Sequence, residues 1–237
     1  MGAFLLKEQK FVPVEAKTLN QAAFVESIRK NQITICTGLA GSGKTLLSLS
    51  ETLNFILNTK SRYKHLTVVR PYVLQQGSEK GGIGYLPGDF NSKFLPFSEA
   101  IQDNLRLLMD ESEIKKLVET KVIDYSIVSM CRGRSFHRTC VLVDEVQNCD
   151  FDSLKMLLTR IADDSKLILV GDPSQCDLPR GVSAITEVAR LLDGIENIGV
   201  VTLNDYNDIQ RSPLIREILK KLEGYKGVKP CANVSKR

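Results

Sequence analysis

One glycine-rich segment combines residue types that are suited to holding phosphate groups: Gly38-Leu39-Ala40-Gly41-Ser42-Gly43-Lys44-Thr45, followed by Leu46. In the pattern Gly-x-x-x-x-Gly-Lys-Thr, glycines let backbone N–H groups converge on phosphate oxygens, and the helix that follows points its N-terminus at the same charge. We expect Lys44 to reach the β- and γ-phosphates and the Thr45 hydroxyl to complete a Mg²⁺ shell. The segment is therefore interpreted as a P-loop that binds a nucleoside triphosphate, in preference to an ordinary glycine-rich turn.

A pair of carboxylates follows a second apolar segment. Residues 141–143 are typical of a buried strand, and Asp144 and Glu145 come directly after them. Ligands of open parallel sheets bind at the carboxyl ends of the strands. We expect Asp144 to hold Mg²⁺ through water and Glu145 to orient and deprotonate an attacking water, because phosphoryl transfer depends on positioning and charge. A solvated strand end is the alternative, and the P-loop in the same chain favours the catalytic interpretation.

Two glutamines lie near the same predicted sheet edge. Gln147 follows the carboxylate pair, and Gln175 ends the turn Gly171-Asp172-Pro173-Ser174-Gln175 after another apolar segment. An amide donates to phosphate or water without adding charge, so Gln175 is suited to sensing a γ-phosphate. A simple turn is the alternative, since Gly, Asp and Pro are turn formers.

The spacing of apolar residues predicts the elements that position these groups. Strands that alternate with helices of this length indicate an α/β fold with a mostly parallel sheet and helices on both faces. Residues 71–90 contain five glycines and two prolines, which predicts a long loop. We expect strands at 33–37, 65–70, 122–128, 139–143, 166–170 and 199–203, and helices at 19–29, 45–57, 94–117 with a break near 110, 153–161, 182–192 and 213–222.

The composition is that of an ordinary globular protein. The 237 residues are 43% hydrophobic and 25% charged, with a formal net charge of +4. This charge permits contact with phosphate polymers but is smaller than the strongly positive charge expected of a dedicated nucleic-acid-binding protein. Six irregularly spaced cysteines with no Cys-x-x-Cys pair favour free thiols in a reducing compartment over a zinc site. With no secretory signal and no apolar run of membrane-spanning length, we expect a cytoplasmic protein without membrane contact.

The three motifs, in this order, resemble the first, second and third motifs of superfamily 1 helicases, and they are still more similar to those of the PhoH-like family. Further matches to that family extend over roughly residues 17–222. They are Val69-Arg70-Pro71, Gly84-Tyr85-Leu86-Pro87-Gly88-Asp89, Arg132-Gly133-Arg134, Leu158-Thr159-Arg160-Ile161, Asp177-Leu178-Pro179-Arg180 and Gln210-Arg211-Ser212-Pro213.

The resemblance implies a RecA-like P-loop ATPase domain at residues 19–223, preceded by an N-terminal extension at 1–18 and followed by a flexible tail at 224–237. It implies dependence on ATP and Mg²⁺, assembly into a homo-oligomer such as a hexameric ring, and, in some relatives, action on RNA. Neither the nuclease domain of some relatives nor the second RecA-like domain of helicases is expected here. Any strand separation would then need neighbouring subunits.

Two site residues depend mainly on the resemblance. Gln21 occupies the place where related ATPases have a glutamine that reads adenine, and a solvated helix start is the alternative. Arg211 matches a family motif just before a predicted helix, and we favour it as an arginine finger that reaches an adjacent subunit, with a surface salt bridge as the alternative. Such an arginine neutralises transition-state charge.

Three further arginines have open roles. Arg132 and Arg134 flank a glycine after an apolar strand, and such a fork suits the phosphates of either ATP or a polynucleotide. Arg70 ends a predicted strand at the ligand edge, where it would line a channel for single-stranded nucleic acid or simply face solvent.

These residues are compatible with three functions. The favoured one is an ATPase that acts on RNA or single-stranded DNA as a helicase-like remodeller. The second is a nucleotide-dependent regulatory or assembly module that binds another protein. The third is a small-molecule kinase, which is disfavoured because Glu145 and Gln175 position water better than an organic hydroxyl group. The short single-domain form would suit a bacterial or viral genome, and the location would be the host cytoplasm if the source is viral.

Overall fold

A computed structural model describes residues 11–71, 90–178 and 183–223 of the chain. Its centre is a six-stranded sheet with the order β3-β2-β4-β5-β1-β6, in which every described pairing is parallel. The predicted α/β fold with a parallel sheet is confirmed. The strands are β1 (Ile33–Gly38), β2 (His65–Arg70), β3 (Ile123–Ile127), β4 (Thr139–Val143), β5 (Lys166–Gly171) and β6 (Ile198–Leu203).

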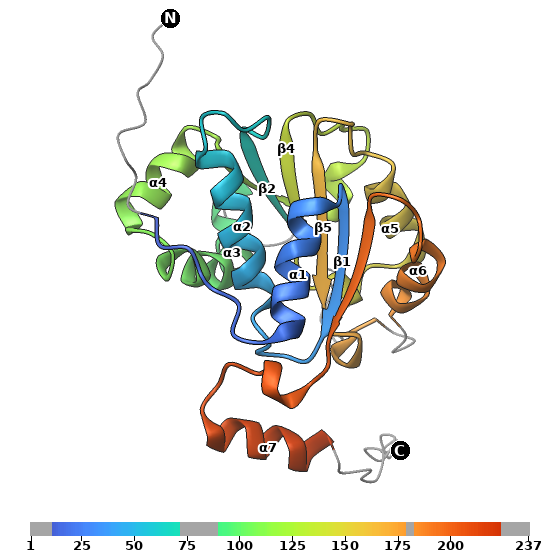
Figure 1. Ribbon diagram of the computed structural model, residues 1–237. Helices are drawn as coiled ribbons and strands as arrows, with labels where there is room; N and C mark the ends of the chain where they lie inside the picture. The colour runs from blue at the N-terminus through green and yellow to red at the C-terminus, as the bar shows by residue number, and fades with distance from the viewer. Residues whose placement is uncertain (1–10, 72–89, 179–182, 224–237) are drawn as a thin grey trace, which may run out of the picture.

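Helices cover both faces of the sheet, as Figure 1 shows. One layer contains α1 (Leu19–Lys30), α2 (Lys44–Leu57), α3 (Phe90–Arg106) and α4 (Glu111–Glu119), and the other contains α5 (Phe151–Leu158) and α6 (Ala184–Leu192). The last helix, α7 (Pro213–Glu223), stands away from the sheet below the other elements (Figure 1). Short 3₁₀ helices follow four of the strands: η2 (Val128–Cys131), η3 (Val146–Asn148), η4 (Pro173–Gln175) and η5 (Tyr206–Asp208).

Alternate residues of the central strands pack into two separate hydrophobic clusters. In β4, Leu142 belongs to the cluster under α1 and α2, whereas Val141 and Val143 belong to the cluster under α5 and α6. All three side chains are fully buried. A parallel strand that is covered on both faces needs such a continuous apolar run, because neither face meets water. The sheet is thus buried on both faces, and the polar site residues lie at the carboxyl ends of its strands.

Most predicted elements are found within a few residues of their expected ends. The helix expected at 153–161 is Phe151–Leu158 instead. Its start is set by Asp150, whose side chain accepts a hydrogen bond from the backbone N–H of Ser153 at 2.8 Å. Its end comes earlier because Ile161 forms a bridge with Phe136.

Some sequence-based predictions fall outside the described residues. They concern residues 72–89, which are most of the predicted loop at 71–90, and the motif positions Pro179 and Arg180. The N-terminal residues 1–10 and the tail at 224–237 also lie outside the described residues. In the part of the chain that is described, no helix has the length and apolar character needed to cross a membrane.

Candidate functional site

The glycine-rich loop lies between the end of β1 and the start of α2. Gly41 and Gly43 have φ angles of 79° and 83°, in the left-handed region that glycine adopts without strain. Gly43 is the N-cap of α2 and makes no side-chain capping hydrogen bond, so the first amides of the helix are left for an anion. The loop therefore has the backbone conformation that the P-loop motif predicts.

Lys44 is folded back over this loop. Its Nζ atom donates to the carbonyl oxygens of Gly38 and Leu39, both at 2.8 Å, and lies 3.3 Å from the Ser42 hydroxyl. Burial lowers the pKa of Lys44, and the nearby carboxylates act in the opposite direction. The ammonium group is thus held at the centre of the loop, where phosphate oxygens would replace weaker carbonyl acceptors.

Thr45 and Asp144 meet at the carboxyl edge of the sheet. The Thr45 hydroxyl donates to Asp144 Oδ1 at 2.8 Å, and Asp144 is only 5% exposed. Burial raises the pKa of Asp144, while the Arg70 guanidinium opposes that shift. A hydroxyl and a carboxylate oxygen this close, beside a phosphate loop, form the hard-oxygen donor set that Mg²⁺ prefers, so these two residues fit the predicted metal site.

Arg70 contacts both carboxylates of the acidic pair. Its Nη2 atom lies 3.3 Å from Asp144 Oδ2 and 3.3 Å from Glu145 Oε1. The reason is the register of the sheet: Val69 of β2 pairs with Val143 of β4, so the residues that follow them are neighbours. The Arg70 side chain is 18% exposed, which disfavours the alternative of a simple solvated strand end. A role in a channel for single-stranded nucleic acid stays a prediction.

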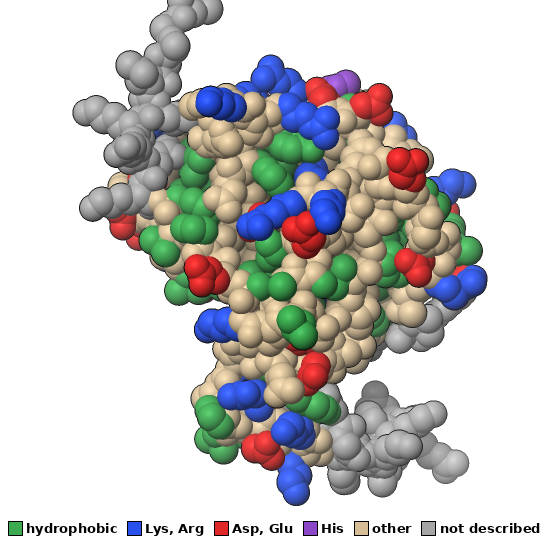
Figure 2. Space-filling view, in the orientation of Figure 1, with side chains coloured by type: hydrophobic (Ala, Val, Ile, Leu, Met, Phe, Trp, Pro, Cys, Tyr) green, Lys and Arg blue, Asp and Glu red, His purple; other side chains and the backbone are tan. Residues whose placement is uncertain are grey.

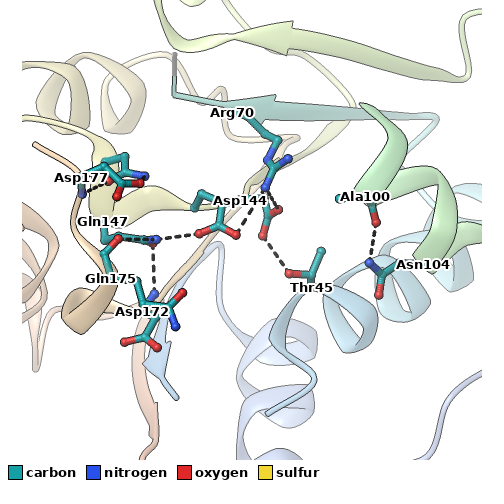
Figure 3. Close-up of polar contacts among 11 residues, drawn as sticks. Thr45, Arg70, Ala100, Asn104, Asp144, Gln147, Asp172, Gln175 and Asp177 are labelled. Carbon is teal, nitrogen blue, oxygen red and sulfur yellow. Dashed lines mark hydrogen bonds and ion pairs between the residues drawn. The ribbon is translucent and has the colours of Figure 1, made fainter. Parts of the chain in front are cut away.

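Glu145 is held by a buried amide. Gln147, 1% exposed, donates from Nε2 to Glu145 Oε2 at 2.6 Å, and its Oε1 accepts from the backbone N–H of Asp172 at 3.1 Å. Figure 3 shows this chain of contacts across the ends of the strands. Glu145 itself has a φ angle of 56°, a conformation that costs energy for a residue other than glycine and is concentrated at functional sites.

Gly171 makes the Gln147 contact possible. A Cβ atom at this position would lie 2.4 Å from Gln147 Oε1 and 3.0 Å from the Gln147 backbone nitrogen. The glycine at the end of β5 thus lets the turn that bears Gln175 approach the acidic pair. No sequence pattern pointed clearly to this network, although Gln147 comes two residues after Glu145.

Gln175 and Arg211 line the same cavity as the phosphate loop. Both side chains are exposed. Arg211 approaches Gly41 so closely that a Cβ atom there would lie 2.8 Å from Arg211 Nε. The neighbouring Gln210 donates its backbone N–H to Gly41 O at 2.9 Å. This placement brings Arg211 beside the phosphate loop of its own chain. Its predicted role as an arginine finger that reaches an adjacent subunit stays a prediction.

Gln21 lies behind the loop and is 2% exposed, not solvated. Its Nε2 atom donates to Ser42 O at 3.0 Å and lies 3.3 Å from Asp208 O, and its Oε1 accepts from the Lys17 backbone N–H at 2.7 Å. These contacts fix the loop to the start of α1. Its amide is thus engaged on both sides in this structure. Reading of adenine by Gln21 stays a prediction.

A cavity of about 550 Å³ is lined by the phosphate loop, Asp144, Glu145, Gln175 and Arg211. Two of the lining residues were not predicted, namely Asn104 in α3 and Leu107 in the turn after it. Nothing in the sequence indicates which turn of α3 lies beside α2. Arg132 and Arg134 are not among the described lining residues; Arg134 instead lies 3.9 Å from Asp124 and over the ring of Phe136. The lining residues are Ala40, Gly41, Gly43, Lys44, Thr45, Leu46, Asn104, Leu107, Asp144, Glu145, Gly171, Asp172, Gln175, Gln210 and Arg211.

A parallel sheet with a phosphate loop after its first strand and an acidic pair at the end of a neighbouring strand defines an α/β P-loop NTPase fold of the RecA-like type. Solved structures agree: the large terminase of a thermophilic bacteriophage, in complex with ADP, has a TM-score of 0.51 to this chain at 14% identity, covering 89% of this chain and 51% of the terminase. At this identity the likeness concerns the fold. Residues 13–223 match the family model described as PhoH-like protein, and the chain belongs to the PhoH-like family.

Relatives support this membership over most of the chain. A PhoH-like protein of Synechocystis is 34% identical over 96% of this chain, and one of Bacillus subtilis is 33% identical over 91%. The protein PhoH of Escherichia coli is 30% identical over 87%. The matched regions span 68%, 66% and 57% of these three relatives, so each relative contains a substantial further part.

Proposed function

We propose that this chain binds ATP together with Mg²⁺, hydrolyses it, and uses the hydrolysis to act on RNA or single-stranded DNA as a helicase-like remodeller. The observation that carries the ATPase part is the position of Glu145. It lines the same cavity as Lys44 and Thr45, it follows Asp144 directly, and Gln147 holds its carboxylate at 2.6 Å. A carboxylate fixed beside a phosphate loop favours water as the acceptor.

In binding, the loop amides and Lys44 would hold the phosphates. Lys44 would exchange its present contacts with Gly38 O and Leu39 O for phosphate oxygens. Thr45 and Asp144 would hold Mg²⁺, whose charge helps to neutralise the phosphates when it is bound. Asp144 would hold the ion as an ionised carboxylate. Bound Mg²⁺ would therefore lower the Asp144 pKa, which burial raises in the free protein.

In hydrolysis, Glu145 would accept a proton from the attacking water. Gln147 donates to Glu145 Oε2, which directs the other carboxylate oxygen, Oε1, toward Arg70. A lone pair must be free for the proton, so Arg70 would release Glu145 in the active arrangement. Gln175 would sense the γ-phosphate, and Arg211, which lies at Gly41, would neutralise charge on the transferred group in the same chain.

Support for a polynucleotide substrate comes from the groove beside the nucleotide cavity. This groove has a volume of about 600 Å³ and shares Glu145 and Gln175 with the nucleotide cavity. Its lining also includes Arg70, Asn148 and Asp177. A strand bound there would contact the residues that hold the catalytic carboxylate. The similarity to superfamily 1 helicase motifs favours the same class of substrate.

The test is steady-state phosphate release from ATP and Mg²⁺, with and without single-stranded RNA and DNA, for the unmodified chain and for Glu145→Gln. The proposal predicts release that depends on Glu145 and rises several-fold with one of the polymers. Absence of phosphate release in the unmodified chain would contradict the ATPase proposal. Transfer of phosphate to an added small-molecule hydroxyl compound would point to a kinase instead.

A second candidate, a nucleotide-dependent assembly module that binds protein, is favoured by α7. This helix stands apart from the sheet (Figure 1), and Leu214 and Ile218 on it are 68% and 42% exposed. Figure 2 shows hydrophobic and basic side chains next to one another on this lobe. Such a surface suits a protein partner or a second copy of the chain in a homo-oligomeric ring. Hydrolysis that is indifferent to RNA and DNA, with assembly that depends on ATP, would favour this candidate.

We also infer a cytoplasmic location. The five described cysteines are free, and burial raises the pKa of Cys140 and of Cys149 to about 12. Such thiols are unreactive and act as small apolar side chains, which suits a reducing compartment. Fractionation of the source cells with an antibody against the chain tests this, and recovery outside the cytoplasm would contradict it.

A further inference from the structure

The nucleotide cavity has walls of two chemical kinds. The wall formed by the loop and the strand ends carries the charged groups described above. Among the described residues, the opposite wall, which we call the α3 wall, is formed by Asn104 in α3 and Leu107 just after it, and Leu46 at the start of α2 lies in the same cavity. A triphosphate chain gains little from two leucines and an amide. We therefore expect the α3 wall to contact a part of the nucleotide other than its phosphates.

Leu107 is presented to this cavity by a turn that is fixed in place. Its side chain is 67% exposed, although Leu105 and Leu108 beside it are fully buried. The turn is closed by a hydrogen bond from Leu107 N to Asn104 O at 3.2 Å, and Leu108 O accepts from Val12 N at 2.9 Å. The buried neighbours hold the backbone of this turn in place, whereas the Leu107 side chain is exposed to solvent.

Asn104 offers a hydrogen-bond acceptor at the same wall. Its Nδ2 atom donates to Ala100 O at 2.7 Å, which orients the amide. Figure 3 shows Asn104 on α3 beside Thr45, on the side of Thr45 turned away from Gln147 and Asp172 in that view. Among the described residues, none donates to Asn104 Oδ1, and this oxygen is left for a ligand.

We propose that Leu46, Leu107 and Asn104 form the subsite for the nucleobase, with the two leucines against the plane of the ring and Asn104 Oδ1 accepting from an exocyclic amino group. Adenine carries such a group at N6, whereas the corresponding O6 of guanine is an acceptor and would repel the amide oxygen. The assignment rests on the proposed function, since it places the base of the nucleotide whose phosphates the loop binds. It adds a base preference that the loop alone does not have.

The experiment compares three probes, ADP, GDP and inorganic tripolyphosphate, by calorimetric titration in the presence of Mg²⁺. Leu107→Ser is expected to weaken ADP binding by roughly tenfold, because an apolar contact with the ring is lost, and to leave tripolyphosphate binding unchanged. Asn104→Leu keeps the size of the side chain and is expected to reduce the preference for ADP over GDP by about threefold to tenfold. Leu191→Ser on α6, a leucine that is 49% exposed, is the matched control and should change nothing.

The outcomes separate this subsite from the proposed function. If the unmodified chain binds tripolyphosphate and ADP but Leu107→Ser and Asn104→Leu behave like it, the base lies elsewhere, such as beside Gln21, which the family resemblance predicts to read adenine, and only the subsite is overturned. Equal loss of tripolyphosphate and ADP in Leu107→Ser would also overturn it, because the residue would then act through the loop. Failure of the unmodified chain to bind any of the probes would overturn both.

Discussion

The phosphate loop and the catalytic edge of the sheet hold their polar groups in different ways. In the loop, Lys44 contacts Gly38, Leu39 and Ser42, all within a few residues of itself in the sequence. At the catalytic edge, Asp144 and Glu145 follow β4 and contact Arg70 at the end of β2. Gln147, which donates to Glu145, accepts in turn from the backbone N–H of Asp172 after β5.

This difference indicates that nucleotide binding and turnover depend on different parts of the site. The cation of the loop is held by acceptors within the loop itself, whereas the contacts at the catalytic edge depend on three strands being in register. Changes in the loop should therefore alter nucleotide binding, and changes at the edge should alter turnover.

Replacement of the catalytic carboxylate should give the largest effect. Glu145→Gln keeps the shape of the side chain but cannot accept a proton, so the rate of ATP hydrolysis should fall by about 10² to 10⁴ while ADP affinity is essentially unchanged. Single-turnover phosphate release and ADP titration measure the two quantities. Glu187→Gln on α6, which removes an exposed carboxylate paired with Arg190, should retain the full rate. An unchanged rate in Glu145→Gln would falsify its role as the base.

Removal of the Lys44 ammonium group should mainly weaken nucleotide binding. In Lys44→Ala the phosphates lose a charged donor, and ADP affinity should fall by roughly tenfold to a hundredfold, since a hydrogen bond to a charged group is worth about 1.5–3 kcal/mol. Calorimetric titration measures it, and Lys155→Ala on the exposed side of α5 is the control. ADP binding as tight as in the unmodified chain would show that Lys44 does not hold the phosphates.

The buried amide should affect turnover through Glu145. Gln147→Leu removes the donor at Glu145 Oε2 and leaves the buried Asp172 N–H without its acceptor. We expect kcat to fall by roughly tenfold with little change in KM, together with a loss of about 1–3 kcal/mol in the free energy of unfolding. The kinetics should be measured well below the Tm of the variant. A rise in KM at constant kcat would contradict a positioning role for Gln147.

The pH dependence of binding should be the smallest effect. Burial lowers the pKa of Lys44 below the usual 10.5, so in the free protein its ammonium loses the proton at a lower pH than an exposed lysine does. Because phosphates bind the charged form, ADP affinity should be complete below that pKa and decline as the pH rises through it, starting below 10.5. ADP titration at increasing pH measures the decline. Lys44→Arg, which stays charged, should remove it.

The sequence was sufficient for the loop because its chemistry is local. Gly41, Gly43, Lys44 and Thr45 are placed by their own spacing between a strand and a helix, and the structure has them as the pattern predicts. The alternation of apolar segments likewise predicted the parallel sheet, since a strand buried on both faces must be apolar throughout.

The catalytic edge and the α3 wall were decided by tertiary structure. Arg70 meets Asp144 because β2 and β4 pair in parallel register, and Gln147 reaches Asp172 because Gly171 leaves room for it. Asn104 and Leu107 join the cavity only through the packing of α3 against α2. A sequence pattern specifies contacts between neighbours in the chain, whereas these contacts depend on how separate elements pack, and that is fixed only when the whole core is assembled.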